Sequence, residues 1–144
     1  MHKQEERWLL GDTGNMIKAM AISGLAAFLA YAVNRLMVAR CGEWAIKFLV
    51  PIIEEGLKTG LSLGFAVSIP AIHILFGIYE AGYDLAANPG ARPQEKWLAA
   101  LAACVGHGVF GGVTWLLLAR GLGAVSSIGM VGILHGLWNA LALH

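Results

Sequence analysis

A long apolar run in the first half of the chain is interrupted by three ionisable residues within little more than one helical turn. Across residues 45–67 the only formal charges are Lys47, Glu54, Glu55 and Lys58. In a helix Lys58 lies three or four residues from each glutamate, so its ammonium can reach either carboxylate. An ionisable residue at the middle of a bilayer costs at least about 2.5 kcal/mol on insertion scales. These residues therefore either pair to hold helices together or form a functional site.

The composition indicates that this run belongs to a membrane protein. Of the 144 residues, 58% are hydrophobic and 13% are charged, and the mean hydropathy is +0.67. A soluble domain usually has about 25% charged residues. The pattern predicts an all-α, polytopic integral membrane helix bundle, a single membrane domain over residues 1–144 with about five transmembrane helices. The formal net charge of +1 gives no support for a nucleic-acid partner.

The polar N-terminus and five apolar runs set the expected boundaries. Residues 1–15 surround Trp8 with charged side chains, which predicts an interfacial segment at the membrane surface. The five spans are expected at about residues 16–38, 44–64, 70–87, 97–118 and 125–143.

Two backbone features of the second span carry their own predictions. Pro51 is expected to kink this helix and to free backbone carbonyls beside the two glutamates. Gly56, Gly60 and Gly64 recur at every fourth residue, and such a stripe predicts the close approach of another helix.

The costly polar residues of the spans fall on four of the five helices. They are Glu54, Glu55, Lys58, His73, Glu80, Asp84, His107, His135 and Asn139. A single histidine in a membrane helix is more often a packing residue than a catalyst. A glutamate pair together with histidines on separate helices is harder to explain by packing. Because each group would be costly against lipid, we expect them to face one polar cavity.

Four short motifs occur in order on these spans. They are Glu54-Glu55-x-x-Lys58, Phe76-x-x-x-Glu80, Ala103-x-x-x-His107 and His135-x-x-x-Asn139. Over about residues 51–143 the chain thereby resembles the PrsW-type intramembrane proteases. Their superfamily includes the CAAX prenyl endopeptidases of the Rce type, the bacteriocin-processing CPBP proteins and the Aph subunit of gamma-secretase. Asparagine at the last position is usual in the Rce-like branch, whereas the PrsW pattern more often has aspartate.

The resemblance implies a glutamate-dependent endopeptidase that acts on a membrane-anchored protein substrate. The catalytic residues that it implies are Glu54, Glu55, His107, His135 and Asn139, with Lys58 and Glu80 in support. One of the two glutamates would be the general base that activates water. His107 would hold this water, and His135 and Asn139 would donate hydrogen bonds to the oxyanion.

Other readings of the same residues stay open. No cofactor is expected, and a metal-dependent variant with zinc bound by Glu55, His107 and His135 is the second choice of mechanism. A non-catalytic scaffold, like the Aph subunit, would use the same residues to hold helices and partners together. A proton-coupled transporter is a weaker third reading. The expected location is the plasma membrane of a prokaryote, with the lipid bilayer around the protein and a homo-oligomer left open.

Overall fold

The computed structural model describes residues 13–87 and 90–142. All regular structure in these residues is helical: α2 (Thr13–Cys41), the π-helix η2 (Ala45–Leu49), α3 (Val50–Gly64), α4 (Ile69–Ala87), α5 (Pro93–Ala119) and α6 (Ala124–Ala142). The predicted all-α bundle is confirmed, and its helices follow the expected order. Of the interfacial segment predicted over residues 1–15, the first twelve residues lie outside the described part, and α2 has begun by Thr13.

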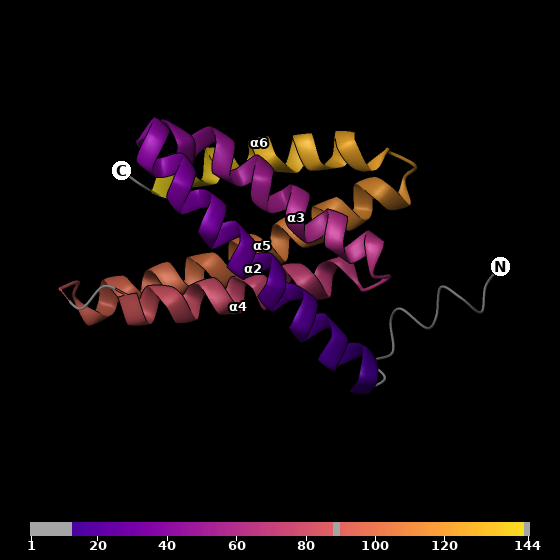
Figure 1. Ribbon diagram of the computed structural model, residues 1–144, viewed down its shortest axis with the longest axis horizontal. Coiled ribbons are helices and arrows are strands. Elements are labelled where there is room, and N and C mark those ends of the chain that lie inside the picture. The colour runs from indigo at the N-terminus through magenta and orange to yellow at the C-terminus, as the bar shows by residue number, and fades with distance from the viewer. Residues whose placement is uncertain (1–12, 88–89, 143–144) are drawn as a thin grey trace.

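The helices form two pairs with a fifth helix across them. The antiparallel helices α4 and α5 lie side by side, and α3 lies against α6 (Figure 1). Helix α2 runs diagonally across α4 and also contacts α3. The C-terminal ends of α2 and α4 lie at the same end of the bundle but diverge there (Figure 1). This divergence positions the pocket described below.

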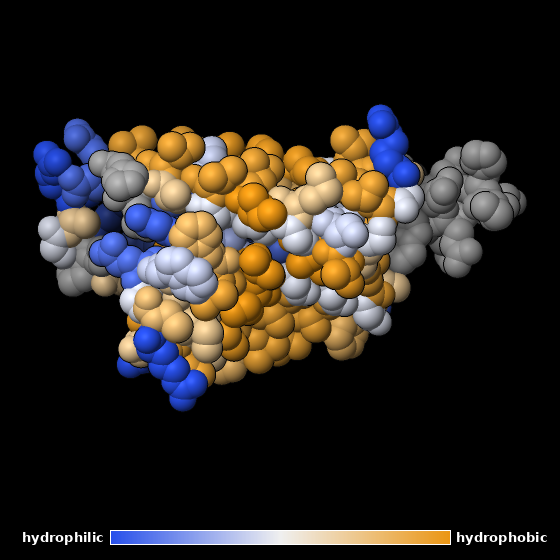
Figure 2. All heavy atoms as spheres, turned by 90° about the horizontal axis from the view of Figure 1, so that it is seen from above, coloured by the Kyte–Doolittle hydropathy of each residue, from blue (hydrophilic) through white to orange (hydrophobic). Residues whose placement is uncertain are grey.

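Three helices in the described part are long and apolar enough to cross a membrane: residues 15–41 of α2, α5, and residues 124–141 of α6. This indicates an integral membrane protein. Helices α3 and α4, which carry the glutamates Glu54, Glu55 and Glu80, do not meet the same measure of length and apolarity. Large apolar side chains such as Phe28, Val125 and Leu141 are exposed. Figure 2 shows such residues across the middle of one face, with hydrophilic residues gathered mainly at one end.

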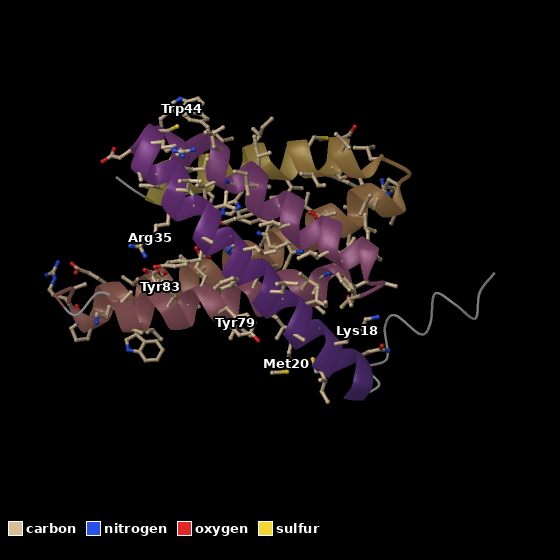
Figure 3. All side chains as sticks on the ribbon, viewed as in Figure 1. Lys18, Met20, Arg35, Trp44, Tyr79 and Tyr83 are labelled. Carbon is tan, nitrogen blue, oxygen red and sulfur yellow. The ribbon has the colours of Figure 1, made fainter. Side chains whose placement is uncertain are left out.

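Small residues on α2 allow it to pack closely on α4. Ala26 and Ala30 are buried against Phe76, and Ala19 is buried against Ile72. Two hydrogen bonds reinforce this crossing. The Ser23 hydroxyl donates to the Ile72 carbonyl at 3.0 Å, and the Tyr79 hydroxyl donates to the Met20 carbonyl at 3.2 Å (Figure 3 labels the second pair).

The prediction that another helix packs against the glycine stripe on α3 is wrong. A Cβ atom added at Gly56, Gly60 or Gly64 would meet nothing within 4 Å. The close approaches lie on other helices, where a Cβ at Gly111 would come within 2.6 Å of the His73 Cβ atom. The physical reason is that α3 turns its polar face, with Glu55 and its neighbours, toward the bundle, and its glycines lie away from that face.

The backbone carbonyls freed by Pro51 lie before the glutamates rather than beside them. The π-helix η2 directly precedes α3, and the Val50 N–H bonds to the Ala45 carbonyl five residues earlier. In this register the next carbonyl, that of Ile46, would need a donor at position 51, where proline has no N–H. The Asn139 amide of α6 donates to this carbonyl instead, at 3.3 Å. Proline frees carbonyls on its N-terminal side, which explains the displacement.

Candidate active site

Glu55 lies at the centre of a buried polar cluster. Its side chain is fully buried and accepts three hydrogen bonds from three helices. The Lys58 Nζ atom lies 2.5 Å from Oε1, His135 Nδ1 lies 3.1 Å from Oε1, and His73 Nε2 lies 3.0 Å from Oε2. Both oxygens are thus occupied by donors of the protein itself. Charge-assisted hydrogen bonds of this kind hold a carboxylate in a fixed position.

Lys58 continues the cluster toward α5 and α4. Its Nζ atom also lies 2.9 Å from His107 Nδ1, and its ammonium can only donate there. His107 therefore accepts at Nδ1 and carries its proton at Nε2, which donates to Glu80 Oε2 at 2.5 Å. The Phe76 ring lies below the ammonium, with 4.7 Å from Nζ to the ring centroid. Both ring nitrogens of His107 are engaged by this chain of contacts.

His73 contacts two acceptors at once. Its Nε2 atom faces Glu55, and its Nδ1 atom lies 2.9 Å from the Ile69 carbonyl. Gly111 on α5 makes room for this ring, since any Cβ there would overlap it. His73 was noticed in the sequence as a polar residue but given no role, and this contact with Glu55 makes it part of the cluster.

Glu54 has a different environment from its neighbour. Its Oε1 atom accepts a hydrogen bond from the Asn34 amide at 2.6 Å, and its Oε2 atom lies 3.8 Å from His135 Nε2. The second distance is too long for a direct hydrogen bond. With its Nδ1 atom directed at Glu55, His135 turns its Nε2 atom toward Glu54. Among the described residues, neither Glu54 Oε2 nor His135 Nε2 has a direct hydrogen-bond partner.

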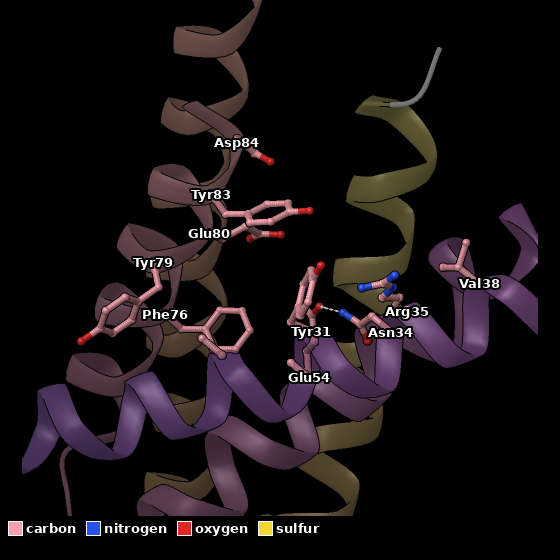
Figure 4. Close-up of a pocket in the computed structure, with 12 residues that line it drawn as sticks. Tyr31, Asn34, Arg35, Val38, Glu54, Phe76, Tyr79, Glu80, Tyr83 and Asp84 are labelled. Carbon is pink, nitrogen blue, oxygen red and sulfur yellow. Dashed lines mark hydrogen bonds between the residues drawn. The ribbon is translucent and has the colours of Figure 1, made fainter. Parts of the chain in front are cut away.

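Glu54 also lines a pocket between α2 and α4 (Figure 4). The pocket has a volume of about 570 Å³. Its polar or aromatic lining residues are Tyr31, Asn34, Arg35, Glu54, Phe76, Tyr79, Glu80, Tyr83 and Asp84. The Glu80 side chain is 40% exposed, whereas that of Glu54 is 6% exposed. The pocket therefore leads from the surface to one of the two adjacent glutamates, and Glu55 does not line it.

Aromatic rings close the site on the side of α5 and α6. Phe110 stacks on His135 with 4.7 Å between ring centroids, and His107 meets His135 edge-on at 5.2 Å. Trp138 packs edge-on against Phe110. These rings exclude water from one side of the histidines, and electrostatic interactions strengthen where water is excluded.

A metal would have a different set of ligands from the expected one. Glu54, His107 and His135 offer ligand atoms that all lie within 4.8 Å of one another, while both oxygens of Glu55 are occupied. Tetrahedral zinc with bonds of about 2.0–2.1 Å spaces its ligand atoms about 3.3 Å apart. The 3.8 Å between Glu54 and His135 is wider, and the Lys58 ammonium beside His107 would repel a divalent cation.

The structure brings most of the predicted site residues together. Glu54, Glu55, Lys58, Glu80, His107 and His135 are linked by the contacts above. Asn139 makes no hydrogen bond to any of these six residues, and its amide donates to the Ile46 carbonyl. Asn34 was missed by sequence reasoning. It is the single asparagine of the first span, and the only signal for it was an uncharged polar side chain in an apolar helix.

Comparison of the chain with protein-family models, with curated proteins and with solved structures returned no match.

Proposed function

We propose that the chain is an intramembrane endopeptidase of a prokaryotic plasma membrane, and that it hydrolyses a peptide bond of a membrane-anchored protein with glutamate-activated water. One observation carries the proposal. Of two adjacent glutamates, Glu55 is locked by three donors, while Glu54 lines a pocket with its Oε2 atom 3.8 Å from an unoccupied nitrogen of His135. A fixed carboxylate and an accessible one suit different roles.

Glu54 is the general base in this proposal. A water molecule can lie about 2.8 Å from both Glu54 Oε2 and His135 Nε2, because these atoms are less than twice that distance apart. Glu54 takes a proton as the water oxygen bonds to the scissile carbonyl carbon. The same proton then passes to the amide nitrogen as the carbon–nitrogen bond breaks. Glu55 touches none of the reacting atoms and positions His135 through the bond to Nδ1.

Asn139 and His135 are the donors that this proposal assigns to the oxyanion. Asn139 uses one amide hydrogen for the Ile46 carbonyl and keeps a second one. His135 can donate through Nε2 only when it is protonated there. Donors aimed at the oxyanion are typically worth about 10²–10³-fold in rate each.

A scaffold function is the second candidate, and one observation favours it. The Glu55, Lys58 and His73 part of the cluster is completely buried and joins α3, α4 and α5 through direct hydrogen bonds. Such a network holds helices together whether or not a substrate is cut. A membrane partner could then be bound by the surface of the bundle without any hydrolysis.

Cleavage of single-span substrates tests the proposal. The purified full chain is reconstituted with a panel of tagged single-span proteins, and cleavage is measured for the wild type, Glu54→Gln and Glu43→Gln. Glu43 is an exposed glutamate outside the pocket and serves as the matched control. We expect Glu54→Gln to lower the rate about 10²–10⁴-fold and Glu43→Gln to leave it unchanged.

The opposite results are equally informative. If Glu54→Gln cleaves at the wild-type rate, Glu54 is not the base. A rate that a chelator abolishes and zinc restores would favour the metal-dependent variant. If the wild type cuts none of the substrates, yet captures one of them in a manner that depends on His107 and His135, the scaffold function replaces the protease.

A further inference from the structure

The pocket extends past Glu54 and Glu80, which line its inner part. Glu80 and Asp84 lie one turn apart on α4, and Asp84 is three residues before the end of that helix. Tyr31 and Arg35 face this region from α2 (Figure 4). We call the part formed by Tyr31, Arg35, Tyr83 and Asp84 the outer subsite. Figure 3 shows Arg35 and Tyr83 near the end of the bundle where α2 and α4 both terminate.

We propose that the outer subsite binds the cationic side chain of a lysine or arginine in the membrane-anchored substrate, close to the scissile bond. This inference rests on the proposed protease function and names its substrate class. The subsite is not needed for water activation, so it can be tested separately. Its support comes from charge, aromatic rings and position.

The charge of the lining favours a cation. Three carboxylates, those of Glu54, Glu80 and Asp84, line the pocket against the single guanidinium of Arg35. Glu54 accepts from Asn34 and Glu80 accepts from His107. Asp84 has no hydrogen-bond or ion-pair partner among the described residues, and Arg35 does not pair with it. A half-buried carboxylate without a partner gains most from a cation that arrives with its own N–H donors.

Two aromatic rings line the same pocket as Asp84. Tyr31 and Tyr83 come from different helices, and their ring centroids lie 5.4 Å apart at an interplanar angle of 57°. The negative faces of such rings attract ammonium and guanidinium groups, by about 0.5–1 kcal/mol at exposed sites and about 2 kcal/mol when water is excluded. A carboxylate in a pocket that two tyrosines also line therefore suits the charged head of a lysine or arginine.

The spacing places the cation one helical turn beyond Glu80. Four residues of α-helix rise about 6 Å, which separates Asp84 from Glu80 in the pocket that Glu54 also lines. An extended substrate spans about 3.3–3.6 Å per residue, so about two residues of substrate cover this distance. Helices α2 and α4 terminate at the same end of the bundle (Figure 1), and lysine and arginine are common just beyond the spans of membrane proteins.

A direct binding experiment tests the subsite without requiring cleavage. The probes are three capped peptides, acetyl-Leu-Arg-Leu-amide and its counterparts with glutamine or glutamate at the centre, titrated against the full chain in detergent micelles. We expect the arginine peptide to bind about tenfold more tightly than the glutamine peptide. Asp84→Asn should remove this preference, Arg35→Gln should keep or increase it, and Glu43→Gln should leave it unchanged.

The other outcomes overturn either the cation subsite or the protease function, and they distinguish the two. Equal binding of the arginine and glutamine peptides would show that no cation subsite exists. Tighter binding of the glutamate peptide, lost in Arg35→Gln, would make the pocket an anion site. An equal loss in Asp84→Asn and Glu43→Gln would show only general surface charge. A preference that depends on Asp84 in a protein that cuts no substrate would leave the subsite standing and remove the protease.

Discussion

Replacing Lys58 by methionine tests the centre of the cluster. Lys58 is completely buried, lies 2.5 Å from Glu55 and 2.9 Å from His107, and sits over the Phe76 ring. Methionine is similar in size and apolar, so Lys58→Met removes the charge and leaves the Glu55 carboxylate without its closest donor. Removing one partner of a buried ion pair costs about 3–5 kcal/mol.

This loss can be read from thermal unfolding of the full chain in detergent. At about 3 °C per kcal/mol for a chain of this length, Lys58→Met should lower Tm by roughly 10 °C. Lys18→Met is the matched control, because Lys18 is exposed on α2 and should change Tm little. A melting curve of Lys58→Met that coincides with that of the wild type would refute the assignment of Lys58 as the buried counter-ion.

A double variant separates the ion pair from simple loss of packing. Glu55→Gln alone weakens three hydrogen bonds, because it exchanges a carboxylate for a neutral amide. In the double variant of Lys58→Met and Glu55→Gln no buried carboxylate is left without its counter-ion. Its loss of stability should therefore be smaller than the sum of the two single losses. Additive losses would mean that the two residues do not interact.

Two further predictions concern stability and activity. Gly111→Ala should lower Tm clearly, because its Cβ atom would overlap His73. The adjacent Gly112→Ala should melt like the wild type, since a Cβ atom there meets nothing within 4 Å. Equal Tm values for the two variants would contradict the close contact of α4 with α5. Asn139→Ala should reduce the unfolding free energy by about 1 kcal/mol, because the hydrogen bond to Ile46 is lost; denaturant titration measures this change. If the cleavage rate also falls more than about tenfold at equal folded concentration, Asn139 has an oxyanion role in addition to its bond to Ile46.

The sequence predicted the helices well because their ends carry strong local signals. Gly42 has a φ of +63°, a conformation that favours glycine, and it follows the last residue of α2. Helix α5 begins at Pro93, four residues before the expected start of the fourth span, at a position where the missing N–H of proline costs nothing. Apolar runs between such signals leave little freedom in where a helix lies. Most charged members of the polar cluster were likewise predicted, because the cost of charges in lipid drives them together, whereas the uncharged Asn34 was not.

The different environments of Glu54 and Glu55 could not be predicted from the sequence. Adjacent residues point about 100° apart on a helix, so one can face a pocket and the other the core. Which of them does so depends on the rotation of α3 within the bundle. The hydrogen bond from Asn34 to Glu54 and that from His73 to Glu55 depend equally on how α2 and α4 cross α3. Periodicity within one helix contains no information on these crossings.

The π-helix before α3 has a consequence for how the site tolerates insertions and deletions. A π-turn holds one residue more than an α-turn, and each residue of an α-helix adds about 100° of rotation. The Asn139 amide holds the π-helical segment at the Ile46 carbonyl. The extra residue within Ala45–Leu49 thus sets how far the face of α3 with the two glutamates is rotated about the helix axis relative to that segment. Deleting one residue there would let the helix close in a regular register. It would also turn Glu54 away from Asn34 and the pocket, although every residue of the site would still be present.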